Sequence, residues 1–351
     1  MRVYCVKIIE EEGIKVKLSK RKCWSILVFI VLPLFILGCS AEKVKTTPNV
    51  TEAIKLNSGA VLKSEEGIYK LYDYKNGEYE KMKSNNIVLA YDKNSSSYIS
   101  VENGKSYVAT NGNRFEIKDL DYSELKLSKD AGYISYFIEN NGYKLKIFDT
   151  ALNKEIEMKS NVSISGTLYD WYDVNTLVYY GVSNDGVNGL FTYNIKENKE
   201  ELLYRIEEGY LAYIKGTIDN VVFLQLTLEN NRELVMINKK TKDVKVLTDN
   251  IEELSDIIIN KEKIYFTGKI SDNASSVYEF KNNKPKRLVF DFPAVVKTEK
   301  GLTIDENGNI LFVGSNSENS NDEQIYTYTQ DGSISAVSKN SVDYVFLDYR
   351  S

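Results

Sequence analysis

Residues 132–140, GYISYFIEN, set the pattern that decides the fold of this chain. Their short apolar and aromatic run ends in a polar turn, which is typical of a β-strand. Four further stretches have the same build: TLVYYGVSN (176–184), NVVFLQLTL (220–228), KIYFTGKIS (263–271) and NILFVGSNS (309–317). Their aromatic positions recur every 43 residues at Phe137, Tyr180, Phe223 and Phe266, and after 46 at Phe312. A regular spacing of this length indicates a repeat protein.

A second strand follows each of these runs, and its own apolar position keeps nearly the same spacing. That second column is Phe148, Tyr193, Ile237, Phe280 and Tyr328. A further strand follows it and a less regular strand precedes it, and no helical periodicity interrupts them. Four short strands in about 43 residues match one blade of a β-propeller. A β-sandwich, the alternative all-β fold, would not keep two columns in step over five copies.

Two weaker repeats precede the five regular ones. Residues 85–119 are predicted to form four strands, whereas residues 59–84 contain only three. We expect the C-terminal stretch VDYVFLDYR (342–350) to supply the missing strand, because pairing the two ends of the chain removes an exposed sheet edge. The sequence therefore predicts an all-β protein, a β-propeller of seven four-stranded blades over residues 58–351. Six or eight blades are the alternatives, since the early repeats are less regular.

Two hairpins carry a family resemblance. LTIDENGNILFV (302–313), and less fully LSKDAGYISYF (127–137), resemble the TolB-like propeller repeat, in which an Asp-containing turn with Gly leads into an apolar strand. The matching positions are Asp305, Gly308 and Ile310, and Asp130, Gly132 and Ile134. The resemblance implies a propeller fold over most of the chain and a location in the cell envelope, and it implies almost nothing about chemistry.

A basic segment and an apolar run lie near the start of the chain. The run WSILVFIVLPLFIL (24–37) follows Lys17, Lys20, Arg21 and Lys22, and it is shorter than a membrane-spanning helix. This arrangement predicts a secretory signal peptide. At its end, Ile36-Leu37-Gly38-Cys39 resembles the bacterial lipobox, which implies that Cys39 carries a diacylglycerol and that the bond before it is cut. A plain transmembrane anchor, or cleavage elsewhere, is the alternative.

These features predict a signal-peptide region at residues 1–38, a lipidated Cys39 with a flexible tether at residues 39–57, and the propeller at residues 58–351. Translation from Val16 instead of Met1 is an alternative that would leave residues 1–15 out of the protein. The predicted location is the extracytoplasmic face of the cell membrane, where the lipid on Cys39 inserts into the bilayer.

Composition excludes several classes of chemistry. The chain has no histidine, so Ser-His-Asp and Cys-His catalytic units and His metal ligands are absent. Its three cysteines, Cys5, Cys23 and Cys39, leave the body without a disulfide framework. Residues 39–351 carry 47 acidic and 38 basic residues, which argues against nucleic acid as a partner. The turn at 305–309 has the oxygen side chains of a calcium loop but occupies a predicted hairpin. No catalytic residue, metal or cofactor is predicted.

One aromatic cluster is the candidate ligand-binding site: Asp170, Trp171, Tyr172 and Asp173. Aromatic rings flanked by carboxylates can stack on and hydrogen-bond to a peptide or a glycan. The alternative is that Trp171 packs between blades. We therefore predict a membrane-anchored extracytoplasmic lipoprotein that acts as a ligand-binding or protein-interaction scaffold, with an envelope protein, peptide or glycan as its ligand. The alternative function is a carboxylate-dependent envelope enzyme, a glycan hydrolase or lyase.

Overall fold

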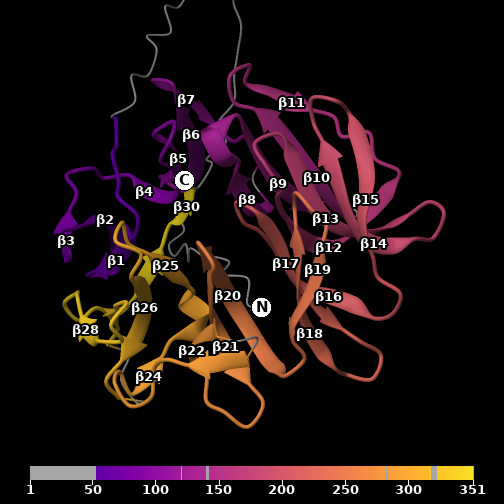
Figure 1. Ribbon diagram of the computed structural model, residues 1–351. Coiled ribbons are helices and arrows are strands. Elements are labelled where there is room, and N and C mark those ends of the chain that lie inside the picture. The colour runs from indigo at the N-terminus through magenta and orange to yellow at the C-terminus, as the bar shows by residue number, and fades with distance from the viewer. Residues whose placement is uncertain (1–52, 120, 140–141, 282–283, 318–321, 351) are drawn as a thin grey trace, which may run out of the picture. The chain divides into compact units, whose positions relative to one another are not determined.

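The structure is a computed structural model that describes residues 53–119, 121–139, 142–281, 284–317 and 322–350. It contains thirty β-strands and two short 3-10 helices, η1 (Lys129–Ala131) and η2 (Thr298–Lys300). Seven sheets follow one another round a ring (Figure 1), which confirms the predicted seven-bladed β-propeller. In this part of the chain, no helix is long and apolar enough to cross a bilayer. The predicted signal peptide and Cys39 lie outside the described residues.

The first four blades contain the following strands. Blade 1 contains β29 (Tyr344–Phe346), β1 (Val61–Glu65), β2 (Ile68–Lys75) and β3 (Glu78–Lys81). Blade 2 contains β4 (Ile87–Asp92), β5 (Ser97–Glu102), β6 (Lys105–Thr110) and β7 (Asn113–Glu116), with β30 (Asp348–Arg350) added in parallel to β4. Blade 3 contains β8 (Tyr122–Leu127), β9 (Tyr133–Glu139), β10 (Tyr143–Asp149) and β11 (Lys154–Ile156). Blade 4 contains β12 (Val162–Trp171), β13 (Thr176–Ser183), β14 (Asn188–Asn194) and β15 (Lys199–Arg205).

The last three blades continue the same order. Blade 5 contains β16 (Tyr210–Gly216), β17 (Asn220–Leu226), β18 (Arg232–Asn238) and β19 (Val244–Thr248). Blade 6 contains β20 (Ile251–Asn260), β21 (Lys263–Ile270), β22 (Ser276–Lys281) and β23 (Lys284–Arg287). Blade 7 contains β24 (Val295–Val296), β25 (Leu302–Ile304), β26 (Ile310–Ser315), β27 (Gln324–Tyr328) and β28 (Ile334–Ala336). Figure 1 shows β8, β12 and β20 toward the centre of the ring and β3, β11, β15 and β28 at its rim.

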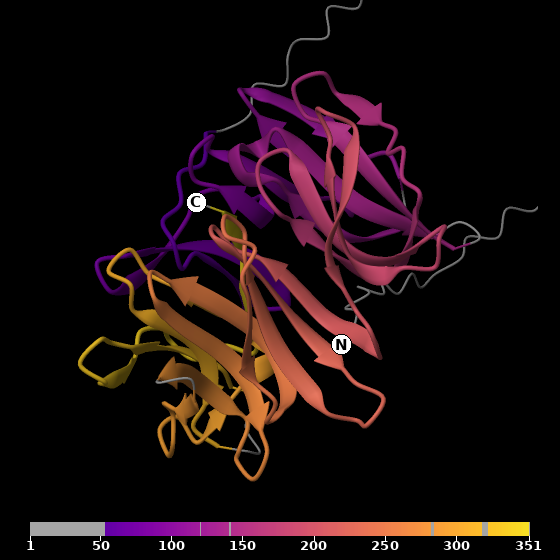
Figure 2. The same ribbon diagram turned by 45° about the vertical axis from the view of Figure 1, so that its right-hand side comes forward.

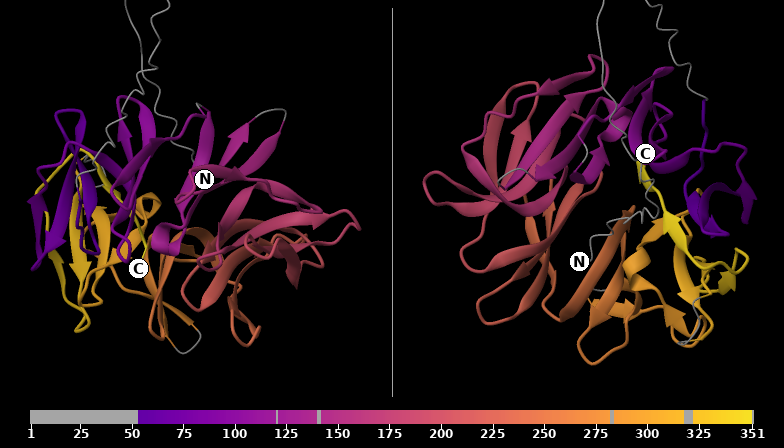
Figure 3. Two further views of the ribbon diagram at one scale, coloured as in Figure 1. Left: turned by 90° about the horizontal axis from the view of Figure 1, so that it is seen from above. Right: turned by 180° about the vertical axis from the view of Figure 1, so that it is seen from behind.

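The C-terminal segment closes the ring. β29 pairs with β1 in antiparallel register, with Val345 opposite Leu62, so blade 1 gains the strand that the sequence lacked. The chain then continues into β30, which pairs with β4 of blade 2. Figures 2 and 3 show the yellow C-terminal strands beside the indigo first blades. The prediction that residues 342–350 supply the missing strand of blade 1 is confirmed. The same residues also add a strand to blade 2.

The core consists of seven apolar layers, one between each pair of neighbouring blades. Between blades 5 and 6, for example, Val222 and Leu224 pack against Phe266 and Tyr278. Both faces of most strands are therefore buried, which explains why the second strands are nearly continuous apolar runs. The stability of each blade depends on its neighbours, because a single four-stranded sheet could not cover either of its own faces.

In blades 3 and 4, the aromatic residues found from the 43-residue spacing lie one position away from the residues that are structurally equivalent to Phe223 in blade 5. Phe223 faces blade 4, the preceding blade, whereas Phe137 and Tyr180 face the blade that follows. The positions equivalent to Phe223 are Tyr136 and Tyr179. Successive side chains on a strand point to opposite faces, so a shift of one residue reverses the blade that a side chain contacts. The spacing identified the strands correctly, but only the structure shows which face of the blade each aromatic side chain occupies.

Carboxylates near the ends of first strands link neighbouring blades. Asp92 of blade 2 accepts a hydrogen bond from the backbone N–H of Asp130 in blade 3 (3.0 Å). Asp170 of blade 4 accepts the N–H of Gly216 in blade 5 (2.9 Å). In the same way, Asp256 of blade 6 accepts the N–H of Leu302 in blade 7 (3.2 Å). These bonds satisfy backbone donors that no strand pairing reaches.

The folded body begins earlier than predicted. Ile54 and Leu56, which the sequence analysis assigned to the flexible tether, are 2% and 5% exposed in the layer between blades 1 and 2. The hydroxyl of Tyr91 donates to the carbonyl of Ile54 (3.4 Å), and Asn57 bonds to Asp73. Two apolar residues at alternate positions are too short a pattern to separate a strand-like segment from a linker. Ile54 and Leu56 therefore belong to the propeller.

The two ends of the propeller differ in the loops they carry. The proximal end holds the loops between the first and second and between the third and fourth strands of each blade. The chain at residues 53–60 also lies there, because Ser58 donates to the carbonyl of Ile304, which borders such a loop. The distal end holds the loops between second and third strands and the connections from one blade to the next.

Removal of residues 343–351 should lower the thermal unfolding midpoint strongly, because β1 becomes an unpaired edge and the layers on both sides of blade 1 open. Removal of residues 348–351 alone keeps β29 and should have a smaller effect. Circular dichroism melting of both truncated chains beside the full chain measures the difference. An unchanged midpoint for the longer deletion would contradict closure by β29.

Candidate functional site

Asp170 lies at the centre of a buried group of charges on the inner strands. Its Oδ1 is 3.3 Å from Nη2 of Arg350 and 3.5 Å from Nζ of Lys126. Its Oδ2 accepts the N–H of Gly216 at 2.9 Å. The Asp170 side chain is only 3% exposed. Residues from blades 3, 4 and 5 and the C-terminal strand β30 therefore meet at one carboxylate.

Electrostatics keeps this carboxylate ionised. Burial alone would raise the pKa of Asp170, but the charges of Lys126 and Arg350 and the N–H of Gly216 outweigh burial and hold the pKa well below its usual range. A carboxylate that stays ionised and is surrounded by donors cannot supply a proton as a general acid. The group is suited to hold β30 in place.

Gly216 is required by the close approach of blades 4 and 5. A Cβ at this position would lie 2.1 Å from the backbone oxygen of Trp171. Glycine therefore lets the first strand of blade 5 come near enough for its N–H to reach Asp170. The sequence shows a glycine at position 216, but only the nearby backbone oxygen of Trp171 explains why glycine is required there.

Trp171 lies inside the layer between blades 3 and 4. It is 3% exposed and stacks on Tyr133, with ring centroids 6.0 Å apart and planes inclined by 19°. Its indole Nε1 has no hydrogen-bond partner among the described residues. This position supports the packing alternative for Trp171, since a buried ring offers no face to a ligand.

Tyr172 and Asp173 lie in the loop after β12, at the proximal end. The Tyr172 ring is covered by two ammonium groups, Nζ of Lys239 at 4.7 Å and Nζ of Lys242 at 5.1 Å from its centroid. Burial lowers the pKa of Lys239 to about 8. Asp173 accepts the N–H of Asn175 (2.8 Å), a turn-stabilising bond. The four candidate residues are thus split between the core and the surface, and ligand binding by the surface pair stays a prediction.

Two carboxyls have pKa values raised by burial, Asp73 and Glu323. Asp73 accepts bonds from the backbone and side chain of Asn57 (2.7 and 2.9 Å). Glu323 accepts the N–H of Tyr344 (3.1 Å), the first residue of β29. Both carboxyls therefore hold chain segments together where the ring closes. No group of three or more Asp, Glu, Cys or His side chains that could hold a metal ion occurs among the described residues.

The turn at 305–309 follows the repeat resemblance. Asp305 Oδ1 accepts the backbone N–H groups of Asn307 (2.9 Å) and Asn309 (2.8 Å), and Gly308 has a φ of 80°. The carboxylate is thus occupied in capping the hairpin, as turn chemistry predicts.

Exposed apolar side chains gather at the distal end. Of the large exposed hydrophobic residues in loops or at strand termini, seven lie at this end and three at the proximal end. The distal set is Ile68, Tyr143, Tyr210, Leu228, Phe290, Phe292 and Val342; the proximal set is Leu152, Ile218 and Val244. Exposed apolar groups concentrated on one side of a protein mark an interaction surface.

Charge also differs between the two ends. The described loop residues of the distal end include fourteen acidic and four basic side chains, whereas those of the proximal end include nine acidic and seven basic. The amino-acid sequence shows that residues 39–351 are acidic, but it does not show that the acidic side chains concentrate at one end of the propeller. The distal end is therefore both the more acidic and the more apolar of the two.

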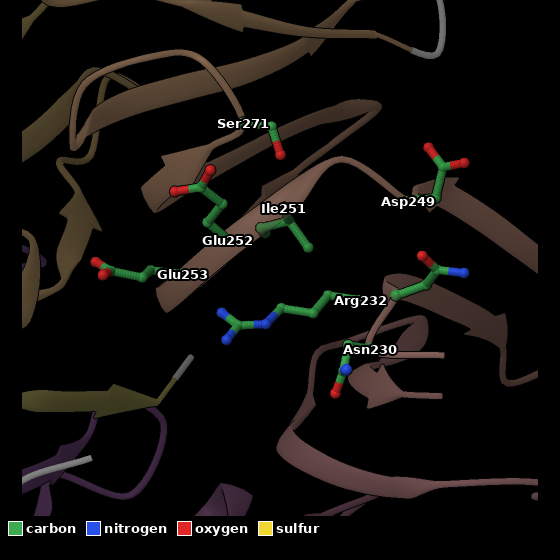
Figure 4. Close-up of a pocket in the computed structure, with 8 residues that line it drawn as sticks. Asn230, Arg232, Asp249, Ile251, Glu252, Glu253 and Ser271 are labelled. Atoms are coloured by element: carbon green, nitrogen blue, oxygen red, sulfur yellow. The ribbon is translucent and has the colours of Figure 1, made fainter. Parts of the chain in front are cut away.

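A polar pocket of about 430 Å³ opens at the distal end between blades 5 and 6. Its lining residues are Asn230, Asn231, Arg232, Asp249, Ile251, Glu252, Glu253 and Ser271. Figure 4 shows Arg232 extending from one side and Glu252 and Glu253 from the other. Lys269 pairs with Glu252 (2.5 Å). The sequence alone did not indicate this pocket, because its residues come from three separate segments without a shared motif.

No family model matches the sequence, and no curated protein matches it. Solved structures with a similar fold include the β-propeller domain of the Trilobed protease from Pyrococcus furiosus, at 15% identity over 82% of this chain and 96% of that chain, with a TM-score of 0.55. An oligogalacturonate lyase in complex with manganese matches at 13% identity over 82% of this chain and 85% of that one, with a TM-score of 0.51. TolB from Acinetobacter baumannii matches at 12% identity over 81% and 80%, with a TM-score of 0.43.

The seven sheets and the likeness to the Trilobed protease domain define the class of protein as a seven-bladed β-propeller. Identities this low show the fold and leave the activity of the chain open. Any function must therefore follow from the side chains of this chain.

Asp170→Asn should lower the free energy of unfolding at neutral pH by about 3–5 kcal/mol, because Lys126 and Arg350 lose their buried counter-charge. The pKa of Asp170 is lower in the folded than in the unfolded chain, so its stabilisation is complete above the ordinary value of 3.8 and is lost as the pH falls below it. Urea unfolding at several pH values measures both effects. The exposed Asp173→Asn variant is the control and should change stability by less than about 1 kcal/mol. Equal losses in the two variants would contradict the assignment.

Trp171→Ala should cost about 3–5 kcal/mol of stability, because it leaves a cavity between blades 3 and 4. In the full chain with Trp24→Phe, Trp171 is the remaining tryptophan. Its emission should be blue-shifted and protected from iodide. A red-shifted emission that iodide quenches would show instead that the ring is open to ligands.

Proposed function

We propose that this protein is an extracytoplasmic lipoprotein, anchored in the cell membrane through acylated Cys39, whose propeller is a scaffold that binds an envelope protein or peptide through its distal end. The observation that carries the binding part is the concentration of exposed apolar side chains at the distal end. Monomeric proteins rarely leave such groups on one side unless another molecule covers them. The lipobox-like stretch before Cys39 carries the anchoring part.

The point where the described chain enters the propeller agrees with this arrangement. The described chain begins at Ala53, and residues 53–60 lie at the proximal end. The chain thus enters the propeller at the end opposite the proposed binding surface.

The alternative function, a carboxylate-dependent glycan hydrolase or lyase, needs two carboxyls open to substrate, one of them with a raised pKa. The two carboxyls with raised pKa values, Asp73 and Glu323, are engaged by Asn57 and by the N–H of Tyr344. Their engagement supports a scaffold over an enzyme. The lyase and protease names belong to the structural neighbours and are not transferred to this chain.

Photo-cross-linking in producing cells tests the binding part. A benzoyl-phenylalanine placed at Leu228, which is 75% exposed at the distal end, should form an adduct with a defined envelope protein. The matched control is the same group at Ile218, which is 70% exposed at the proximal end and should form none. Adducts only at Ile218, or at neither position, would contradict the proposal.

Fractionation of the same cells tests the anchor. Cys39→Ala should move the protein out of the membrane fraction, because it removes the acylated thiol. A variant that stays bound to the membrane would refute lipid anchoring and leave the binding part to the cross-linking result.

A further inference from the structure

Blades 5, 6 and 7 bring aromatic anchors and an acidic pocket together at the distal end. Phe290 and Phe292, in the connection from β23 to β24, are 58% and 50% exposed. They stand two residues apart with Asp291 between them. The other exposed aromatic residues of this end, Tyr143 and Tyr210, lie in separate blades, whereas the two phenylalanines share one connection.

Each ring contacts a side chain of the protein that fixes its position. The guanidinium of Arg287 lies 5.2 Å from the Phe290 ring centroid and donates to the carbonyls of Val289 and Phe290 (2.6 and 3.1 Å). The Phe292 ring packs edge-on against buried Tyr326, with centroids 5.4 Å apart. A ring fixed on one side and exposed on the other loses little entropy when a partner covers it. Such rings are the usual anchors of protein interfaces.

The polar pocket between blades 5 and 6 borders the loop from β21 to β22, which also lies close to Phe290 and Phe292. Ser271 lines the pocket at the start of the loop from β21 to β22. Ser276, just after that loop, donates to the carbonyl of Val289, next to Phe290 (2.8 Å). The pocket and the two rings therefore lie on either side of one short connection in blade 6.

The pocket has carboxylates available for a cation. Asp249 and Glu253 are exposed and form no ion pair with any other residue that the structure describes. Glu252 already pairs with Lys269, and Arg232 is the one basic side chain of the lining. The excess of acidic residues over the whole distal end adds a long-range field of the same sign, which attracts basic partners.

We propose that this region of blades 5, 6 and 7 binds a basic polypeptide segment that carries aromatic or large aliphatic side chains. A lysine or arginine of the segment enters the pocket at Asp249 and Glu253, and an apolar side chain of the segment covers Phe290 and Phe292. The proposal rests on the proposed function and specifies the partner of the distal end. Anionic polymers are disfavoured by the charge of this end, and a neutral glycan would use the rings but not the carboxylates.

The test uses the full chain in a non-ionic detergent and a short fluorescein-labelled peptide of lysine, phenylalanine and leucine, followed by fluorescence anisotropy. Two matched peptides replace either the lysines by glutamate or the apolar residues by serine. Binding is expected only for the first peptide, and it should weaken at least about tenfold between about 50 and 500 mM NaCl.

Two pairs of substitutions separate the contributions of the pocket and the rings. Asp249→Asn with Glu253→Gln, and Phe290→Ala with Phe292→Ala, should each weaken binding about tenfold or more. All four side chains are exposed, so the melting temperature should stay close to that of the unchanged chain. Ile218→Ala with Asp219→Asn at the proximal end is the matched control and should bind normally.

Equal binding of the glutamate peptide, binding that does not depend on salt, or binding that neither distal pair weakens would each overturn the proposal. Binding of a neutral oligosaccharide that only the phenylalanine pair weakens would overturn it in favour of a glycan. These outcomes differ from failure of the proposed function. A Leu228 adduct in cells beside a negative peptide result refutes only the basic chemistry of the partner, whereas loss of that adduct refutes the scaffold.

Discussion

Closure of the ring by the C-terminal segment is the constraint on which the rest of the structure depends. Each blade buries both faces against its neighbours, so the ring is stable only if the last blade meets the first. β29 completes blade 1 and β30 extends blade 2. Arg350 then crosses to Asp170 in blade 4, far away in the sequence. The final residues thus join three blades.

Carboxylates on the inner strands link each of three blades to the blade that follows it. Asp92, Asp170 and Asp256 each accept a backbone N–H from the next blade, and Asp170 also pairs with Lys126 and Arg350. A buried ion pair that loses one partner is costly, so these residues specify how blades meet. Because the central charges are committed to structure, the surface loops are the part of the molecule that is free to evolve a binding function.

The two ends of the ring therefore differ in the chemistry of their surfaces. The proximal end receives the chain from its N-terminal side and carries nearly balanced charge. The distal end combines an acidic surface with exposed phenylalanines and a polar pocket between blades 5 and 6. This contrast arises from loops and from residues at strand ends, such as Arg232, Glu252 and Glu253. A propeller can acquire a binding surface on one end without changing its core.

The sequence by itself determined the near-constant repeat, the four strands of a blade and the use of residues 342–350 to close the ring. These features follow from hydrophobic patterning, which is local and repeats in every copy. The structure decided between seven blades and the alternatives of six or eight. Only the tertiary structure decided the fate of the cluster at residues 169–173. A bulge in the pairing of β12 with β13, between Ile164 and Tyr169, sets which of its side chains face the core. Burial of Trp171, pairing of Asp170 with Arg350, and collection of the apolar loops at one end all depend on contacts between distant segments, which no single stretch of sequence encodes.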